Sequence, residues 1–139
     1  MLVLEPHWKC YIITTAQPVL TPQQCNELIR IGQSEPKINA SIGTGNKNEK
    51  VDNSYRKSII SWIPFAKAIP IYQIIGEWVS RINMNSFGFD TVQLTERGQY
   101  AEYSKGGFYN WHMDSNTEMS AMPTVRKISM TLLLSDPKD

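Results

Sequence analysis

The chain is poor in cysteine and histidine, with two of each in 139 residues. Cys10 and Cys25 are too few for a disulfide scaffold, and no Cys-x-x-Cys pair is present to suggest a zinc site. We expect both thiols to be buried, in a protein of the reducing cytoplasm. The histidines are His7 and His112. A metal or acid–base site that uses an imidazole must therefore include one of these two.

The sequence also lacks a strong charge of either sign. Its net charge is +1, and acidic and basic residues are mixed along the chain. We therefore expect no nucleic acid partner, which would require a basic stripe, and no polybasic membrane patch. No apolar run approaches the roughly 20 residues that span a bilayer, and Met1 to Pro6 lacks the basic start of a signal peptide. At 41% hydrophobic and 19% charged, the composition is that of a single globular domain.

Hydrophobic periodicity predicts helices early in the chain and strands late. Thr21 and Pro22 have the residue types of a helix N-cap and first turn. Apolar residues at helical spacing from Ile71 to Ile82 predict a second helix, which the segment Asn83 to Gly88 closes. Alternating or β-branched runs predict strands at 8–14, 56–63, 108–112 and 127–134, and one or two strands within 92–103, interrupted near Gly98. Because β-α-β alternation is missing, this order favours an α+β fold with helices on an antiparallel sheet.

The pair His112 and Asp114 is the main candidate for chemistry. Residues i and i+2 of a strand point the same way, so an imidazole nitrogen and a carboxylate oxygen can converge on one cation. They would form two-thirds of the 2-His-1-carboxylate triad that holds non-heme Fe(II). A lone His-x-Asp pair also arises by chance, and its simplest interpretation is a strand end with a local hydrogen bond.

The surrounding residues favour a metal site over that simple interpretation. Gly106 and Gly107 permit a tight turn that returns Tyr103 to the pair, where its hydroxyl can donate to a bound carboxylate. The strand predicted at 127–134 can form a neighbouring wall. Aromatic residues around the pair can exclude water: Phe108, Tyr109 and Trp111. One face of the later strand carries three residues: Ser129, Thr131 and Leu133.

The segment YSKGGFYNWHMD (Tyr103 to Asp114), followed by RKISMTLLLSDP, resembles the prolyl-4-hydroxylase-type 2-oxoglutarate/Fe(II) oxygenases. It is most similar to the bacterial and phage branch called PKHD-type hydroxylases. RKSIISWIP and RINMNSFGFD resemble the region before the core, so the likeness covers most of the chain. It implies a double-stranded β-helix, jelly-roll or cupin-like, with N-terminal helices packed on the sheet. Within one domain, 1–139, residues 1–90 would support the fold and 91–139 would start the core.

The resemblance implies an oxidoreductase that hydroxylates a C–H bond, with Fe(II), 2-oxoglutarate as cosubstrate and ascorbate as a candidate auxiliary cofactor. The substrate would be a peptide, with a prolyl residue as candidate target, or a small molecule. His112 and Asp114 would be the metal ligands and catalytic residues. Arg56 and Arg126 match recurring family arginines, and we assign them no catalytic role.

The resemblance also implies residues that bind the cosubstrate. Tyr103 occupies the place of a tyrosine that contacts 2-oxoglutarate. Tyr109 and Trp111 would line the pocket floor or support the ligands. Thr131 and Leu133 lie on the following strand, and Leu133 falls near a second contact position that is often tyrosine. A leucine there cannot form the hydrogen bond.

The family pattern requires a distal histidine and a basic residue, usually arginine, for 2-oxoglutarate. No histidine follows Asp114, and His7 is an alternative third ligand. We expect the chain to be part of a longer gene product, so that the C-terminal part of the barrel is missing. The alternatives are a homodimer that covers an open sheet edge and a degenerate relative.

Two other functional interpretations remain open. One is a non-catalytic binding or assembly module on the same fold, which needs no third ligand. The other is a hydrolase that uses Ser115 or Ser129 with His112. No nucleophile-elbow glycine pattern surrounds either serine, which disfavours the hydrolase.

Overall fold

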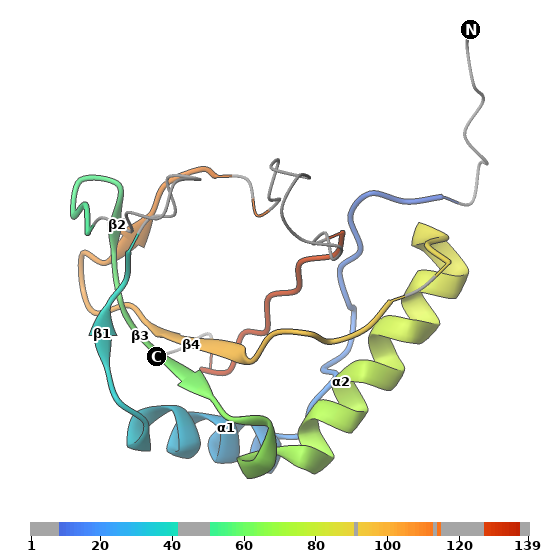
Figure 1. The fold of residues 1–139 in the computed structure, drawn as a ribbon, viewed down its shortest axis with the longest axis horizontal. Helices are drawn as coiled ribbons and strands as arrows, with labels where there is room; N and C mark the ends of the chain where they lie inside the picture. Colours follow the sequence, from blue (N-terminus) through green and yellow to red (C-terminus); the bar gives the residue numbers. More distant parts are fainter. Residues whose placement is uncertain (1–8, 42–50, 91, 113, 115–126, 137–139) are drawn as a thin grey trace, which may run out of the picture.

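The structure is a computed structural model that describes residues 9–41, 51–90, 92–112, 114 and 127–136. It contains two α-helices and two small antiparallel sheets, so the predicted α+β class is confirmed. In Figure 1 the two helices lie along the bottom and the right of the view, and the smaller sheet lies at the upper left, away from them. Neither helix in the described part of the chain combines the length and apolar character needed to cross a membrane.

The first helix, α1 (Pro22–Ser34), begins where the sequence predicts. Thr21 is its N-cap, and the backbone N–H of Gln24 donates to the threonine hydroxyl over 3.3 Å. The Gln24 side chain in turn accepts from the Thr21 N–H over 2.8 Å, which completes a capping box. The buried face of α1 carries Leu28, Ile31 and Gly32.

The second helix, α2 (Ile69–Ile82), also matches its prediction, with Pro70 in the first turn. A 3-10 turn, η1 (Phe65–Lys67), precedes it, and a π-helical turn, η2 (Asn83–Phe87), follows it. Gly88 then ends the helical run with a φ of 72°, a left-handed conformation that favours glycine. The periodic apolar residues predicted the buried face correctly: Ile71, Ile75 and Val79.

The larger sheet has the strand order β1-β3-β4. The strands are β1 (Ile38–Asn39), β3 (Ile59–Ile63) and β4 (Gly98–Glu102), all antiparallel to their neighbours. The smaller sheet pairs β2 (Arg56–Lys57) with β5 (Phe108–Tyr109). Because β2 and β3 follow each other directly, the run predicted as one strand at 56–63 passes from one sheet into the other.

The core lies where α1 and α2 meet the larger sheet. Its buried residues are Leu20, Leu28, Ile31, Ile63, Ala68, Ile71, Ile75 and Val79. Gly32 brings α1 close to the sheet, because its backbone lies directly against the ring of Tyr100. The buried hydroxyl of Ser61 donates to the Gly32 carbonyl over 2.6 Å. A helix can approach a sheet this closely only where a side chain is missing.

Two strand predictions are wrong within the described residues. Residues 9–14 form no strand, and the Cys10 N–H donates to the carbonyl of Ser86 over 2.7 Å instead. Residues 92–97 do not pair, so β4 covers only the end of the run predicted at 92–103. The predicted burial of the thiols also fails for Cys10, which is exposed, whereas Cys25 is partly buried. These local patterns showed β propensity but supplied no neighbouring strand to pair with.

The prediction of a strand at 127–134 is wrong in a more informative way. The segment (red in Figure 1) is not assigned as a strand, yet alternate residues are exposed and half-buried. The half-buried set packs against the core: Ile128, Met130, Leu132 and Leu134. The period-two pattern therefore predicted the inward face correctly, although the segment has no paired strand among the described residues.

The hydroxyl of Tyr72 on α2 holds the start of β4 against the end of β3. It donates to the Ile63 carbonyl over 2.8 Å and accepts from the Gly98 N–H over 2.6 Å. Burial raises the pKa of this phenol above its ordinary value, so the hydroxyl stays protonated and can serve in both roles. It thereby satisfies two backbone groups at the end of the ladder.

The packing of Gly32 generates a testable prediction. A Cβ at this position would lie 2.3 Å from Cγ of Tyr100, whereas at Gly76 the nearest atom, Cδ1 of Leu94, is 3.7 Å away. We expect Gly32→Ala to lower the free energy of unfolding by about 1–3 kcal/mol through overpacking. Gly76→Ala, the matched control on α2, should raise it by up to about 1 kcal/mol through helix propensity. Urea denaturation measures both, and equal effects of the two substitutions would contradict the close packing.

A second prediction concerns the two hydrogen bonds of Tyr72. Tyr72→Phe leaves a backbone donor and a backbone acceptor without their partner, so the free energy of unfolding should fall by about 1–3 kcal/mol. Tyr100→Phe is the control, because the Tyr100 hydroxyl makes hydrogen bonds to the side chains of Glu102, over 3.3 Å, and Gln33 rather than to backbone groups. Thermal and urea denaturation of both variants test the prediction. A larger loss of unfolding free energy in Tyr100→Phe than in Tyr72→Phe would contradict the prediction.

Candidate metal centre

His112 and Asp114 lie just after β5 and face each other. Nε2 of His112 is 3.1 Å from Oδ1 of Asp114. Neither residue is in a strand, because β5 ends at Tyr109 and the predicted run 108–112 is correct only at its start. The two side chains therefore approach each other as predicted, although neither residue lies in a strand. Both side chains are partly exposed, by 30% and 45%, so an incoming ligand can reach them.

The other ring nitrogen of His112 is bound to the backbone. Nδ1 lies 2.8 Å from the carbonyl oxygen of Asn110. Because a carbonyl oxygen only accepts, Nδ1 must carry the proton. In the neutral ring this leaves a lone pair on Nε2, directed at a carboxylate oxygen that also carries only lone pairs. Such a contact is favourable only when a proton or a metal cation lies between the two atoms.

The ring of Tyr109, which is itself covered by Arg56, supports one face of the His112 imidazole. The Tyr109 ring stacks on the His112 ring, with centroids 3.6 Å apart and planes 16° from parallel. The Arg56 guanidinium lies over the Tyr109 ring, 4.3 Å from its centroid. Arg56 and Tyr109 are register partners in the β2–β5 pair. The pairing of these strands therefore builds a continuous stack from the guanidinium to the imidazole.

Arg56 is 7% exposed and is held in place by two neutral groups. Its Nε donates to the Ser58 hydroxyl over 3.0 Å, and Nη2 donates to Oε1 of Gln99 over 2.7 Å. Gln99 lies on β4, so the guanidinium ties the smaller sheet to the larger one. A buried charge with neutral partners is costly unless it is fully hydrogen-bonded or interacts with a π face.

The electrostatic surroundings of Tyr109 also place these groups together. Burial is the largest effect and raises the pKa of the Tyr109 phenol. The Arg56 guanidinium acts in the opposite direction and lowers it, while Asp114, Tyr55 and Tyr103 add to the rise. The Tyr109 phenol is thus neutral at ordinary pH, and its ring supports His112 without adding a charge.

Asp114 has a further partner from a distant part of the chain. The Ser129 hydroxyl donates a short hydrogen bond to Oδ2 of Asp114, the oxygen opposite to the one that faces His112. This bond argues against Ser129 as a hydrolase nucleophile, which would have to donate to the histidine. Ser115, the other candidate nucleophile, lies outside the described residues.

Tyr103 is placed as the predicted turn requires. It follows β4, and the Gly107 N–H donates to the Ser104 carbonyl over 2.7 Å to close the turn. Gly106 has a φ of 77°, which a residue with a Cβ rarely adopts. The phenol is about half exposed and influences the pKa of Tyr109. The structure therefore brings Tyr103 to the same region as the pair.

The remaining predicted site residues are not part of the His112–Asp114 site in the described structure. Thr131 and Leu133 share the exposed face of 127–134 with Ser129, and neither side chain makes a hydrogen bond or ring contact within the described part of the chain. Leu133 is 87% exposed. Trp111 is 99% exposed and so lines no pocket floor here, although its carbonyl accepts from the Tyr55 hydroxyl over 2.6 Å.

A third protein ligand is not present among the residues that the structure describes. Within those ranges no three His, Cys, Asp or Glu side chains gather as a metal site would require. His7 and Arg126, the candidates for a third ligand and a recurring arginine, both lie outside the described residues. Among the described residues, the geometry therefore supplies two adjacent donors.

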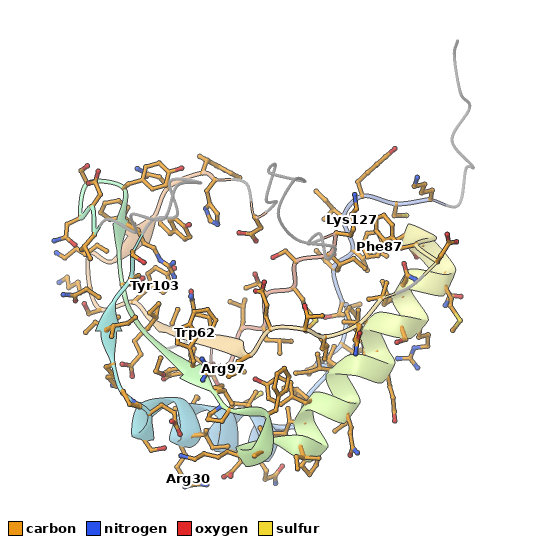
Figure 2. The ribbon with its side chains drawn as sticks, in the orientation of Figure 1. Arg30, Trp62, Phe87, Arg97, Tyr103 and Lys127 are labelled. Atoms are coloured by element: carbon orange, nitrogen blue, oxygen red, sulfur yellow. The ribbon has the colours of Figure 1, made fainter. Side chains whose placement is uncertain are left out.

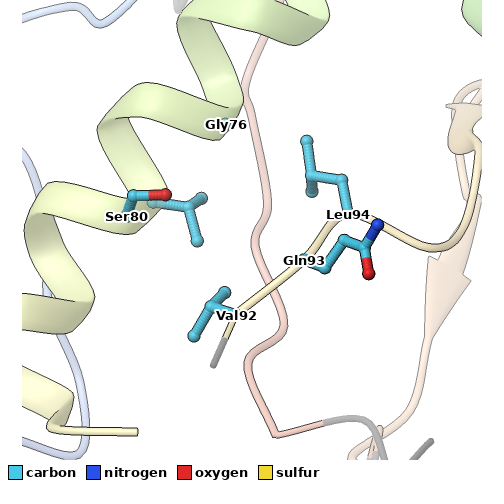
Figure 3. Close-up of a pocket in the computed structure, with 6 residues that line it drawn as sticks. Gly76, Ser80, Val92, Gln93 and Leu94 are labelled. Carbon is cyan, nitrogen blue, oxygen red and sulfur yellow. The ribbon is translucent and has the colours of Figure 1, made fainter. Parts of the chain in front are cut away.

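Two shallow pockets of the described surface lie away from this pair. One separates α2 from residues 92–94, and Figure 3 shows Gly76 and Ser80 facing Val92 and Leu94 across it. The other lies beside Trp62 and Arg97, which Figure 2 labels and which form a cation–π contact of 5.9 Å. Neither pocket is lined by His112 or Asp114.

Sequence reasoning missed one contributor to the site, Asn110, and named Ser129 and Arg56 without the roles they have here. Asn110 acts through its carbonyl, so its residue type carried no signal. The hydrogen bond from Ser129 to Asp114 joins residues 15 positions apart and leaves no local pattern. Arg56 is followed by two further polar residues, Lys57 and Ser58, so its position did not mark it as buried.

Comparison with known proteins adds no relative. No family model matches the chain, and neither a curated protein nor a solved structure is significantly similar to it. The interpretation of the site therefore depends on its own residues and their geometry.

Proposed function

We propose that His112 and Asp114 are two of the protein ligands of an Fe(II) site in a 2-oxoglutarate-dependent oxygenase. The observation that carries this proposal is the pairing of two lone-pair donors. Nδ1 of His112 is committed to a carbonyl, and Nε2 lies 3.1 Å from Oδ1 of Asp114. A divalent cation bound to both atoms would take the place of a proton on Nε2 and make this contact a shared coordination site.

The distance between the donors fits adjacent positions on one metal ion. With metal–ligand bonds of about 2.1 Å, two neighbouring corners of an octahedron are roughly 3 Å apart. The backbone hydrogen bond at Nδ1 is the outer contact that metal-bound histidines usually make, because it fixes the tautomer and the ring orientation. One imidazole and one carboxylate are also the donor types of the facial triad.

The other proposed residues act around this pair. Tyr103 would donate its phenol proton to a carboxylate of 2-oxoglutarate, and Thr131 and Leu133 would line the outer side of the cosubstrate. Tyr109 would hold the imidazole plane rather than bind the cosubstrate directly. When bound, Fe(II) and 2-oxoglutarate would allow O2, the oxidant, to be activated, with 2-oxoglutarate oxidised to succinate and CO2 to supply two of the four electrons, a chemistry that no side chain provides. The reaction would be hydroxylation of a C–H bond in a peptide, with a prolyl residue as candidate target, or in a small molecule.

The fold proposed for this chemistry is a double-stranded β-helix. Two antiparallel sheets joined through a single run at 56–63 support it, because the chain passes directly from one sheet to the other. The proposal also needs a third protein ligand and a basic group for 2-oxoglutarate, which the described residues do not supply.

The proposal predicts a spectroscopic signal that depends on Asp114. Under exclusion of oxygen, Fe(II) with 2-oxoglutarate should give the protein a visible charge-transfer band, because Fe(II) transfers charge to the π* orbital of a chelated 2-oxo acid. Asp114→Ala should abolish the band, since it removes one of two adjacent donors. Asp90→Ala, which removes an exposed carboxylate elsewhere, is the matched control and should leave the band intact.

The outcomes of this titration separate two functions. A band that survives Asp114→Ala would sink the assignment of the ligand. A folded wild-type protein that gives no band would instead favour the non-catalytic binding or assembly module. Circular dichroism of each variant shows whether the loss of a band reflects the loss of a ligand or the loss of the fold.

A further inference from the structure

The two oxygens of the Asp114 carboxylate have different neighbours. Oδ1 faces Nε2 of His112, and Oδ2 accepts a short hydrogen bond from the Ser129 hydroxyl. A carboxylate can rotate about its own axis, and either oxygen can then bind a cation. A hydrogen-bond donor that is fixed at one oxygen prevents this rotation, so the other oxygen stays directed at the histidine.

We propose that Ser129 is a positioning residue that holds Asp114 as a ligand through one oxygen only. The inference rests on the proposed function and deepens it, because it assigns the geometry of the carboxylate at the same site. A carboxylate that binds through both oxygens would occupy an additional coordination position. A 2-oxo acid chelates through two atoms, so a site for such a cosubstrate must keep adjacent positions open.

The core packing determines where Ser129 lies. Its neighbours Ile128 and Met130 are half-buried and pack against the hydrophobic core. Because alternate residues of this segment face opposite sides, burying these two turns the Ser129 side chain outward, toward Asp114. The energy of core packing thus fixes a polar contact that the exposed pair could not hold by itself.

Metal affinity tests this assignment without relying on turnover. Mn(II) is a suitable probe because it accepts the same oxygen and nitrogen ligands and broadens the NMR signals of nearby nuclei even when it binds weakly. Titration of the full chain with Mn(II) should broaden the signals of His112 and Asp114. We expect Ser129→Ala to weaken binding about 10-fold, as loss of an outer-shell hydrogen bond typically does.

Two further variants distinguish positioning from a general structural effect. Ser129→Thr keeps the hydroxyl and should restore the affinity to within about two-fold. Ser135→Ala makes the same chemical change at an exposed serine just after the segment 127–134 and should leave the affinity unchanged. In the metal-free protein, the carboxyl carbon of Asp114 should change its chemical shift in Ser129→Ala but not in Ser135→Ala.

Each result bears on a different claim. If wild-type protein binds Mn(II) at His112 but Ser129→Ala binds it equally well, the positioning role is wrong and the proposed function stands. An unchanged carboxyl shift in Ser129→Ala likewise overturns the inference, because it means that the hydrogen bond is missing. If Mn(II) broadens neither His112 nor Asp114 in the wild type, the metal site and the role of Ser129 fall together.

Discussion

The antiparallel pairing of β2 with β5 is the constraint on which the candidate site depends. It sets Arg56 opposite Tyr109, so that the guanidinium, the phenol ring and the His112 imidazole stack in one column. The bond from Arg56 to Gln99 on β4 then ties that column to the larger sheet. A two-residue ladder is weak by itself. It is supported by the contact of the Arg56 guanidinium with the Tyr109 ring and by the hydrogen bond from the Asn110 N–H to the Tyr55 carbonyl, both of which would break if the strands separated.

Features determined by nearby residues could be predicted from the sequence. The start of α1 follows from Thr21 and Pro22, and the buried face of α2 follows from apolar residues at helical spacing. Strands were predicted less well, because a strand exists only when a distant segment pairs with it. The segment 127–134 shows the distinction: its alternation predicted which side chains face the core, but pairing depends on residues elsewhere in the chain.

The candidate site was also predicted only in part: the pair was identified, but the groups that orient it were not. His112 and Asp114 were identified from their spacing and do converge, although neither residue lies in a strand. The groups that orient them could not be predicted, because each belongs to another segment. The carbonyl of Asn110 carries no residue signature, and Ser129 reaches Asp114 only once its neighbours are packed on the core.

The two proposed ligands are held by different kinds of force. The imidazole is fixed by a backbone hydrogen bond and by an aromatic stack that ends on a buried charge, so its orientation depends on the sheets. The carboxylate is more exposed, and its Ser129 contact depends on packing of the segment 127–134. Changes in that packing would therefore disturb Asp114 while leaving His112 in place. The positions of His112 and Asp114 therefore depend on separate parts of the fold, and these parts are connected through the core.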